Sequence, residues 1–129
     1  MPRWALVAVV LCALAAAPAR AAPPPKVLDS GDSGQTVTLA KGQHLRIELS
    51  VCYSCGYHWE TRKAPSRRVL RRLKQRTSGG CKPPCTGGSA VTKFRYAARA
   101  RGDTSLRLGY IPPGSSTPAQ TFRLRIKVR

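Results

Sequence analysis

Four cysteines in two close pairs are the side chains best suited to chemistry in this sequence. Cys52 and Cys55 are separated by two residues, and Cys81 and Cys85 by three. Thiolates at such spacings can hold a zinc ion in tetrahedral geometry. The same thiols can instead form two disulfides, and the redox state of the folding compartment decides between these two chemistries.

The N-terminal segment predicts that compartment. Arg3 is followed by an apolar run, residues 4–17, and then by Ala19-Arg20-Ala21, which is typical of a secretory signal peptide and its cleavage site. We therefore expect residues 1–21 to be removed and the protein to be exported, to the periplasm or out of the cell. This location favours four oxidised cysteines and no metal site. The apolar run is too short to cross a membrane comfortably, so we expect no transmembrane segment.

The net charge of +18 predicts an affinity for anionic partners. Basic residues are densest between Arg62 and Arg76, a segment without aromatic side chains that could stack on nucleobases. A polyanion, either nucleic acid or an acidic polysaccharide, is therefore one candidate partner. We expect no enzyme, because neither His44 nor His58 is accompanied by a carboxylate pair or a Cys-His-Asn set.

Apolar and polar residues alternate along most of the chain after Gln35. This pattern, with glycine and proline in the intervening turns, predicts β-strands. The predicted class is all-β, an immunoglobulin-like antiparallel β-sandwich of seven or eight strands with Trp59 in its core. Residues 22–34 are rich in Pro, Ala, Gly, Ser and Asp, and we interpret them as a flexible leader before a domain of residues 35–129. The predicted strands are 37–39, 45–51, 57–61, 69–73, 92–98, 106–110 and 122–128.

Three connections between these strands carry the cysteines and much of the glycine and proline. If successive strands alternate in direction, these three loops emerge at the same end of the sandwich. Because they are then neighbours, we favour disulfides that join the first loop to the second, with a local pair inside each loop as the alternative. We also expect Gly56, in the first loop, to need a positive φ. The three loops are residues 52–56, 77–89 and 111–119.

The loop sequences resemble those of the chagasin family of inhibitors of papain-like cysteine peptidases, over about residues 35–129. In that family the first loop reads N-P-T-T-G followed by an aromatic residue and a tryptophan, the second G-x-G-G, and the third R-P-W or R-P-F. Here the first reads Cys52-Tyr53-Ser54-Cys55-Gly56, followed by Tyr57 and Trp59. The second reads Cys85-Thr86-Gly87-Gly88, and the third Ile111-Pro112-Pro113. Pro113 thus stands where the family has an aromatic residue.

The resemblance implies an inhibitor that inserts three adjacent loops into the active-site cleft of a papain-like peptidase. We expect it to be secreted and monomeric, without cofactor or metal. The alternative is a basic secreted β-sandwich module that binds a polyanion through the segment between Arg62 and Arg76. For the inhibitor, the residues expected to contact the peptidase are Ser54, Cys55, Gly56, Thr86, Gly87, Gly88, Ile111, Pro112 and Pro113. The residues expected to form disulfides are Cys52, Cys55, Cys81 and Cys85.

Overall fold

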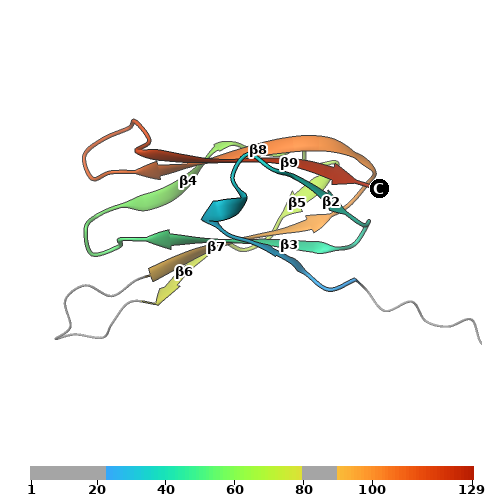
Figure 1. Cartoon of the computed structure of the whole chain (residues 1–129), viewed down its shortest axis with the longest axis horizontal. Coiled ribbons are helices and arrows are strands. Elements are labelled where there is room, and N and C mark those ends of the chain that lie inside the picture. The colour runs from blue at the N-terminus through green and yellow to red at the C-terminus, as the bar shows by residue number, and fades with distance from the viewer. Residues whose placement is uncertain (1–22, 80–89) are drawn as a thin grey trace, which may run out of the picture.

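The computed structural model describes residues 23–79 and 90–129, which form two β-sheets packed face to face (Figure 1). The all-β prediction is confirmed, and the described residues contain nine strands and one short 3-10 helix. The first five elements are β1 (Lys26–Leu28), η1 (Ser30–Asp32), β2 (Thr36–Leu39), β3 (His44–Val51) and β4 (His58–Lys63). The others are β5 (Leu70–Arg72), β6 (Arg76–Gly79), β7 (Ala90–Ala98), β8 (Gly102–Ile111) and β9 (Gln120–Val128). No helix in the described ranges is long and apolar enough to span a membrane.

One sheet has the strand order β1-β3-β7-β5, with β6 also pairing with β7, and the other has the order β2-β9-β8-β4. The pairs between β3 and β7, β4 and β8, and β8 and β9 are antiparallel, as expected. At one edge of each sheet, however, β1 pairs with β3 and β2 pairs with β9 in parallel. Alternation along a strand decides which face is apolar but carries no information on the direction of its partner.

The core lies between the sheets and is built from the inward residues of the alternating strands. On β3, Leu45, Ile47 and Leu49 are completely buried. On β9, the apolar residues from Phe122 to Val128 are buried, while Arg123 and Arg125 between them are exposed. Full burial of one such aliphatic side chain contributes about 1.5–3 kcal/mol, so the alternation supplies most of the drive to fold.

The interpretation of residues 22–34 as a flexible leader is wrong for the part that forms β1 and η1. Leu28 of β1 is only 6% exposed and belongs to the core cluster. The 3-10 helix that follows is closed by a capping box, in which Asp29 accepts from the backbone N–H of Gly31 and Asp32 accepts from that of Asp29, both at 2.9 Å. Because this segment is mostly polar, its composition did not indicate that Leu28 is buried or that β1 pairs with β3.

The predicted strand 69–73 is shorter than expected, and a second strand, β6, extends from Arg76 into the predicted second loop. Both β5 and β6 pair with β7. All four residues of β6 are exposed, so the segment has no apolar alternation that the sequence could show. Its backbone hydrogen bonds with β7 define it as a strand.

Candidate functional site

The connection between β3 and β4, residues 52–57, is a compact turn that is closed by hydrogen bonds and by a disulfide. The backbone N–H groups of Cys55 and Tyr57 both donate to the carbonyl of Cys52, each at 3.2 Å. A disulfide joins Cys52 to Cys55. The preferred prediction of disulfides between loops is therefore wrong for these two cysteines, and the local pairing is observed. The covalent bond and the hydrogen bonds hold the turn together.

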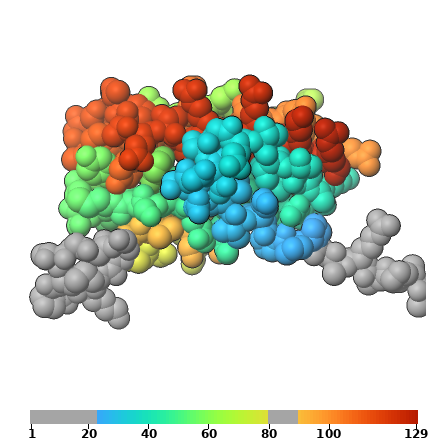
Figure 2. Space-filling view, viewed as in Figure 1, coloured from blue at the N-terminus to red at the C-terminus, as the bar shows by residue number. Residues whose placement is uncertain are grey.

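Gly56 brings this turn against the connection between β8 and β9, residues 112–119. Its φ is 85°, which confirms the predicted positive φ. A Cβ atom at this position would lie 3.0 Å from the Cβ of Pro113, closer than two carbon atoms pack without one of them moving. The absence of a side chain at Gly56 thus permits both the turn and the contact between the two loops. In Figure 2 these segments, green and orange-red, form one continuous surface at the left end of the molecule.

Three aromatic residues support the turn from below. The ring of Tyr110 on β8 lies 4.8 Å from the ring of Tyr57, in a stacked arrangement, and 4.8 Å from that of Trp59. Trp59 is buried, as predicted, and its indole N–H donates to the carbonyl of Ser50 at 3.0 Å. The Tyr110 hydroxyl accepts a hydrogen bond of 2.9 Å from the backbone N–H of Cys52. These contacts fix the position of the turn relative to the core.

The connection between β8 and β9 is likewise ordered by local bonds. The backbone N–H of Ser115 donates to the carbonyl of Pro112 at 3.3 Å, and that of Ala119 donates to the carbonyl of Tyr110 at 2.8 Å. Pro112 is half-buried and Pro113 is exposed. Ile111, which we predicted to contact a peptidase, is instead the last residue of β8 and is only 2% exposed. That expectation is wrong, because Ile111 is buried at the end of β8, where it pairs with His58 on the strand face opposite to that of Leu108.

The outer face of β4, beside this end, carries a small charged cluster. Glu60 accepts from Arg62 at 2.8 Å and lies 3.3 Å from the imidazole of His58. The hydrogen bond from Arg62, and then that with His58, lowers the pKa of the Glu60 carboxyl below its ordinary value. Among the described residues no three His, Cys, Asp or Glu side chains come together as a metal site would require. The cluster is a surface ion-pair network.

Comparison with known proteins decides the family. The model of the chagasin family of peptidase inhibitors, I42, matches residues 38–126. The chain belongs to the chagasin family. That family consists of peptidase inhibitors rather than enzymes. No curated protein sequence matches the chain.

Solved structures share the fold at low sequence identity. The cysteine protease inhibitor EhICP2 from Entamoeba histolytica is 16% identical with a TM-score of 0.71, and the match covers 82% of this chain and 96% of that one. Amebosin is 21% identical with a TM-score of 0.63, covering 83% and 100%. PbICP-C, solved in complex with falcipain-2, is 16% identical with a TM-score of 0.52, covering 86% and 95%. The chagasin-like sandwich predicted from sequence is thus confirmed.

The structure brings together the first and third of the three chagasin-family loops. It also describes the ends of the two strands that flank the second loop. Ser54, Cys55 and Gly56 are exposed on the first loop, beside Pro113 of the third. The predicted second loop, residues 77–89, is described only as far as Gly79, so Cys81, Cys85, Thr86, Gly87 and Gly88 lie outside the described residues. The last residue of β6, Gly79, and the first of β7, Ala90, pair with each other, and Ala90 also pairs with Val51 at the end of β3. The positions of these strand ends therefore agree with the expectation that all three loops emerge at the same end of the sandwich.

Two residues of this chagasin-family site, Tyr53 and Tyr110, were not predicted from the sequence. Tyr53 is 69% exposed at the tip of the first loop, where a large aromatic side chain has no partner in the core. Tyr110 positions the loop through its hydroxyl. The signal for Tyr53 was an aromatic residue between two cysteines in a turn. The bond of Tyr110 joins residues 58 positions apart, and no local pattern indicates it.

Proposed function

We propose that this chagasin-family protein inhibits papain-like cysteine peptidases by placing the loop end of the sandwich in the active-site cleft. The contact between Gly56 and Pro113 carries the proposal, since it joins the first and third loops into one rigid projection. Ordering loops before binding reduces the entropy lost on association. The similar fold of EhICP2, a cysteine protease inhibitor, and of PbICP-C, solved with falcipain-2, supports the same target class.

The first loop has the geometry of an inhibitor rather than of a substrate. The Cα atoms of Cys52 and Cys55 are 5.2 Å apart, whereas three residues of extended chain span about 10 Å. The disulfide prevents the loop from extending along a cleft as a substrate strand does. We therefore assign Ser54, Cys55 and Gly56 to the contact with the catalytic centre, with the turn as the shape that resists cleavage.

Tyr53 supplies the aromatic contact that Pro113 cannot. Its exposed ring at the tip of the first loop can bury apolar area and donate a hydrogen bond, the combination that makes tyrosine common in binding energy hot spots. Pro112 and Pro113 then keep the third loop rigid beside it. Thr86, Gly87 and Gly88 remain the predicted backbone contacts of the second loop.

The inhibition constant against a panel of papain-like enzymes tests the proposal. We expect inhibition at micromolar concentration or below by the oxidised protein and none of a serine peptidase. A chain that inhibits no member of the panel would share only the fold with its family. Tyr53→Ala should then be measured against Lys41→Ala, an exposed position in the turn between β2 and β3. A greater loss for Tyr53→Ala is expected.

We also propose that the protein is exported and acts as a monomer. The disulfide between Cys52 and Cys55 supports an oxidising compartment, because such bonds persist outside the cytosol. Mass spectrometry of the protein recovered outside the cytoplasm should find Ala22 at its N-terminus. Light scattering should give the mass of one chain.

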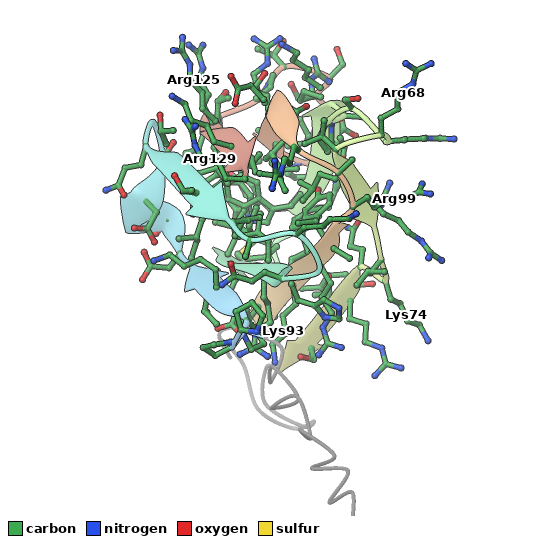
Figure 3. The ribbon with its side chains drawn as sticks, turned by 90° about the vertical axis from the view of Figure 1, so that its right-hand side faces the viewer. Arg68, Lys74, Lys93, Arg99, Arg125 and Arg129 are labelled. Carbon is green, nitrogen blue, oxygen red and sulfur yellow. A yellow bond between two sulfur atoms is a disulfide. The ribbon has the colours of Figure 1, made fainter. Side chains whose placement is uncertain are left out.

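A second function, binding of a polyanion, is favoured by the charge balance of the segment between Arg62 and Arg76. Arg62 pairs with Glu60, but in the described part of the chain no other basic residue of this segment lies within ion-pair distance of a carboxylate. Arg68 and Lys74 project from one side of the molecule together with Arg99 (Figure 3). Affinity for heparin should therefore fall steeply between low and moderate salt. Neutralising Arg67 and Arg68 should weaken it while leaving peptidase inhibition unchanged.

A further inference from the structure

A pocket of about 390 Å³ opens at the side of the sandwich, away from the loop end, between the edge strands β4 and β5. The connection of residues 64–69 joins these two strands and closes the pocket from one end. Because β4 and β5 belong to different sheets, no backbone pairing covers the space between them. The pocket therefore reaches the edge of the core, where the side chains of Leu70 and Tyr96 are completely buried.

One exposed arginine, Arg72, occupies an inward position in the register of this edge strand. In the pairing of β5 with β7, Leu70 lies opposite Ala98 and Arg72 opposite Tyr96. Directly opposed residues in an antiparallel pair share a face, and Leu70, Ala98 and Tyr96 are all buried. The side chain of Arg72 therefore starts on the inward face, and its guanidinium donates to the side-chain oxygen of Gln75 at 2.7 Å.

Two hydroxyl groups in the pocket lack hydrogen-bond partners. Tyr96 is completely buried, yet its phenol oxygen forms no hydrogen bond. The hydroxyl oxygen of Thr61 on β4 is also buried and also forms none. Both residues line the pocket. Burial raises the pKa of the Tyr96 phenol, and the Arg72 charge and the nearby Thr61 hydroxyl lower it in part. A buried hydroxyl without a partner is unusual and requires one, which an ordered water, an ion or a ligand can supply.

The walls of the pocket are positively charged. Arg67, Arg71 and Arg99 line it together with Arg72, and within the described residues none of the four pairs with a carboxylate. A second hollow of about 350 Å³ lies beside it and shares Arg67 and Arg99. All five acidic residues of the sequence are among the described ones, so no carboxylate from the remaining segments neutralises this surface.

We propose that the pocket binds a tetrahedral oxyanion, the sulfate or phosphate group of a larger ligand. The hydroxyls of Tyr96 and Thr61 donate to its oxygens at the floor of the pocket, and Arg72 with the arginines of the wall balances its charge. In the polyanion binding proposed above as a second function, this pocket is the one site with defined hydrogen-bond geometry. Binding there does not depend on peptidase inhibition. It requires the hydroxyl of a buried tyrosine, which a purely electrostatic surface does not.

Titration calorimetry of the purified protein with sodium sulfate and with sodium phosphate, at constant ionic strength, tests the pocket. We expect saturable binding of one anion per chain. Tyr96→Phe and Arg72→Gln should each weaken it about tenfold, the effect of losing one hydrogen bond to a charged group. Arg125→Gln on the outer face of β9 should change it less than about twofold, as expected for one distant, screened charge.

Tyr96→Phe should fold normally, because the deleted hydroxyl has no partner to lose. Tighter binding of phosphate would point to a phosphorylated ligand, and tighter binding of sulfate to a sulfated polysaccharide; either result supports the site. Unsaturable binding, or equal losses in Tyr96→Phe, Arg72→Gln and Arg125→Gln, would overturn it. Heparin affinity that still depends on Arg67 and Arg68 would in that case leave the second function standing without the pocket.

Discussion

The backbone N–H of Cys52 donates a hydrogen bond of 2.9 Å to the hydroxyl oxygen of Tyr110. Cys52 begins the first loop, and Tyr110 is the penultimate residue of the strand that leads into the third. One hydroxyl therefore links the two loops that are proposed to enter the peptidase cleft. We expect both peptidase inhibition and stability to depend on this hydrogen bond, and the two effects can be measured separately.

Tyr110→Phe should remove only this acceptor and keep the aromatic stack. We expect the free energy of unfolding to fall by about 1–2 kcal/mol, because a partly buried N–H loses its partner. Inhibition should weaken more than about fivefold as the first loop loses its support. Denaturant titration and inhibition constants measure the two effects. Tyr57→Phe is the control, since its hydroxyl bonds to none of the described residues, and equal losses in both variants would contradict the assignment.

Gly56→Ala should weaken inhibition strongly while the sandwich remains folded. A side chain at a φ of 85° costs about 1–2 kcal/mol, and the new Cβ would also press on Pro113. Gly42→Ala is the matched control: its φ is also 85°, but nothing lies within 4 Å of the added Cβ. Both variants should lose similar backbone stability, but only Gly56→Ala should lose inhibition, by more than about tenfold if the loop shifts off the cleft. Identical inhibition constants would show that the loop contact is unimportant.

Replacement of Cys52 and Cys55 by serine should destabilise the protein by about 2 kcal/mol, the chain-entropy value for so short a loop. Circular dichroism should still show a β-sandwich, because the core residues are unchanged. Inhibition should weaken because the first loop can now extend, and prolonged incubation should expose it to cleavage. Mass spectrometry of the reaction mixture would detect that cleavage, and an uncleaved, fully inhibitory variant would refute the role of the disulfide.

All four cysteines from Cys52 to Cys85 should be oxidised in the exported protein. Thiol titration of denatured, unreduced protein is expected to find none free. Peptide mapping should recover Cys52 linked to Cys55, as observed, and Cys81 linked to Cys85, which is a prediction. A peptide that joins Cys52 to Cys81 would contradict the pairing.

The stability contributed by Glu60 should depend on pH. Its pKa is lowered in the folded state by Arg62 and then by His58, so the carboxylate stabilises the protein above the ordinary value of 4.5. This contribution is lost as the pH falls through the lowered pKa. The difference in unfolding free energy between the protein and Glu60→Gln should be small, because the group is exposed, and should vanish in acid. A difference that is constant with pH would show that the ion pairs do not contribute.

Residues that alternate along one strand could be assigned from the sequence. Burial of Leu45, Ile47 and Leu49 follows from period-2 spacing, because successive side chains of a strand point to opposite faces. The positive φ of Gly56 followed from its place at the end of a tight turn. The adjacency of the first and third loops followed from strand parity. Each of these inferences needs only local geometry or the direction of the chain.

The parts that sequence did not predict depend on partners distant in the chain. Leu28 is buried because β1 pairs with β3, and Ile111 is buried where β8 continues one residue further than predicted, although its partner His58 on β4 is exposed. Cys52 bonds to Cys55 because the turn itself brings them together, whereas nearness of whole loops does not ensure that two sulfur atoms can meet.

The sequence by itself thus determined the fold class, the inward face of the central strands and the end of the molecule that carries the loops, since these follow from periodicity and turn chemistry. Only the tertiary structure decided the partner of each cysteine, the support that Tyr110 gives to the first loop, and the pocket in which Tyr96 and Arg72 face the gap between two sheets. Such contacts join residues far apart in sequence, and their distances are set by how the two sheets pack.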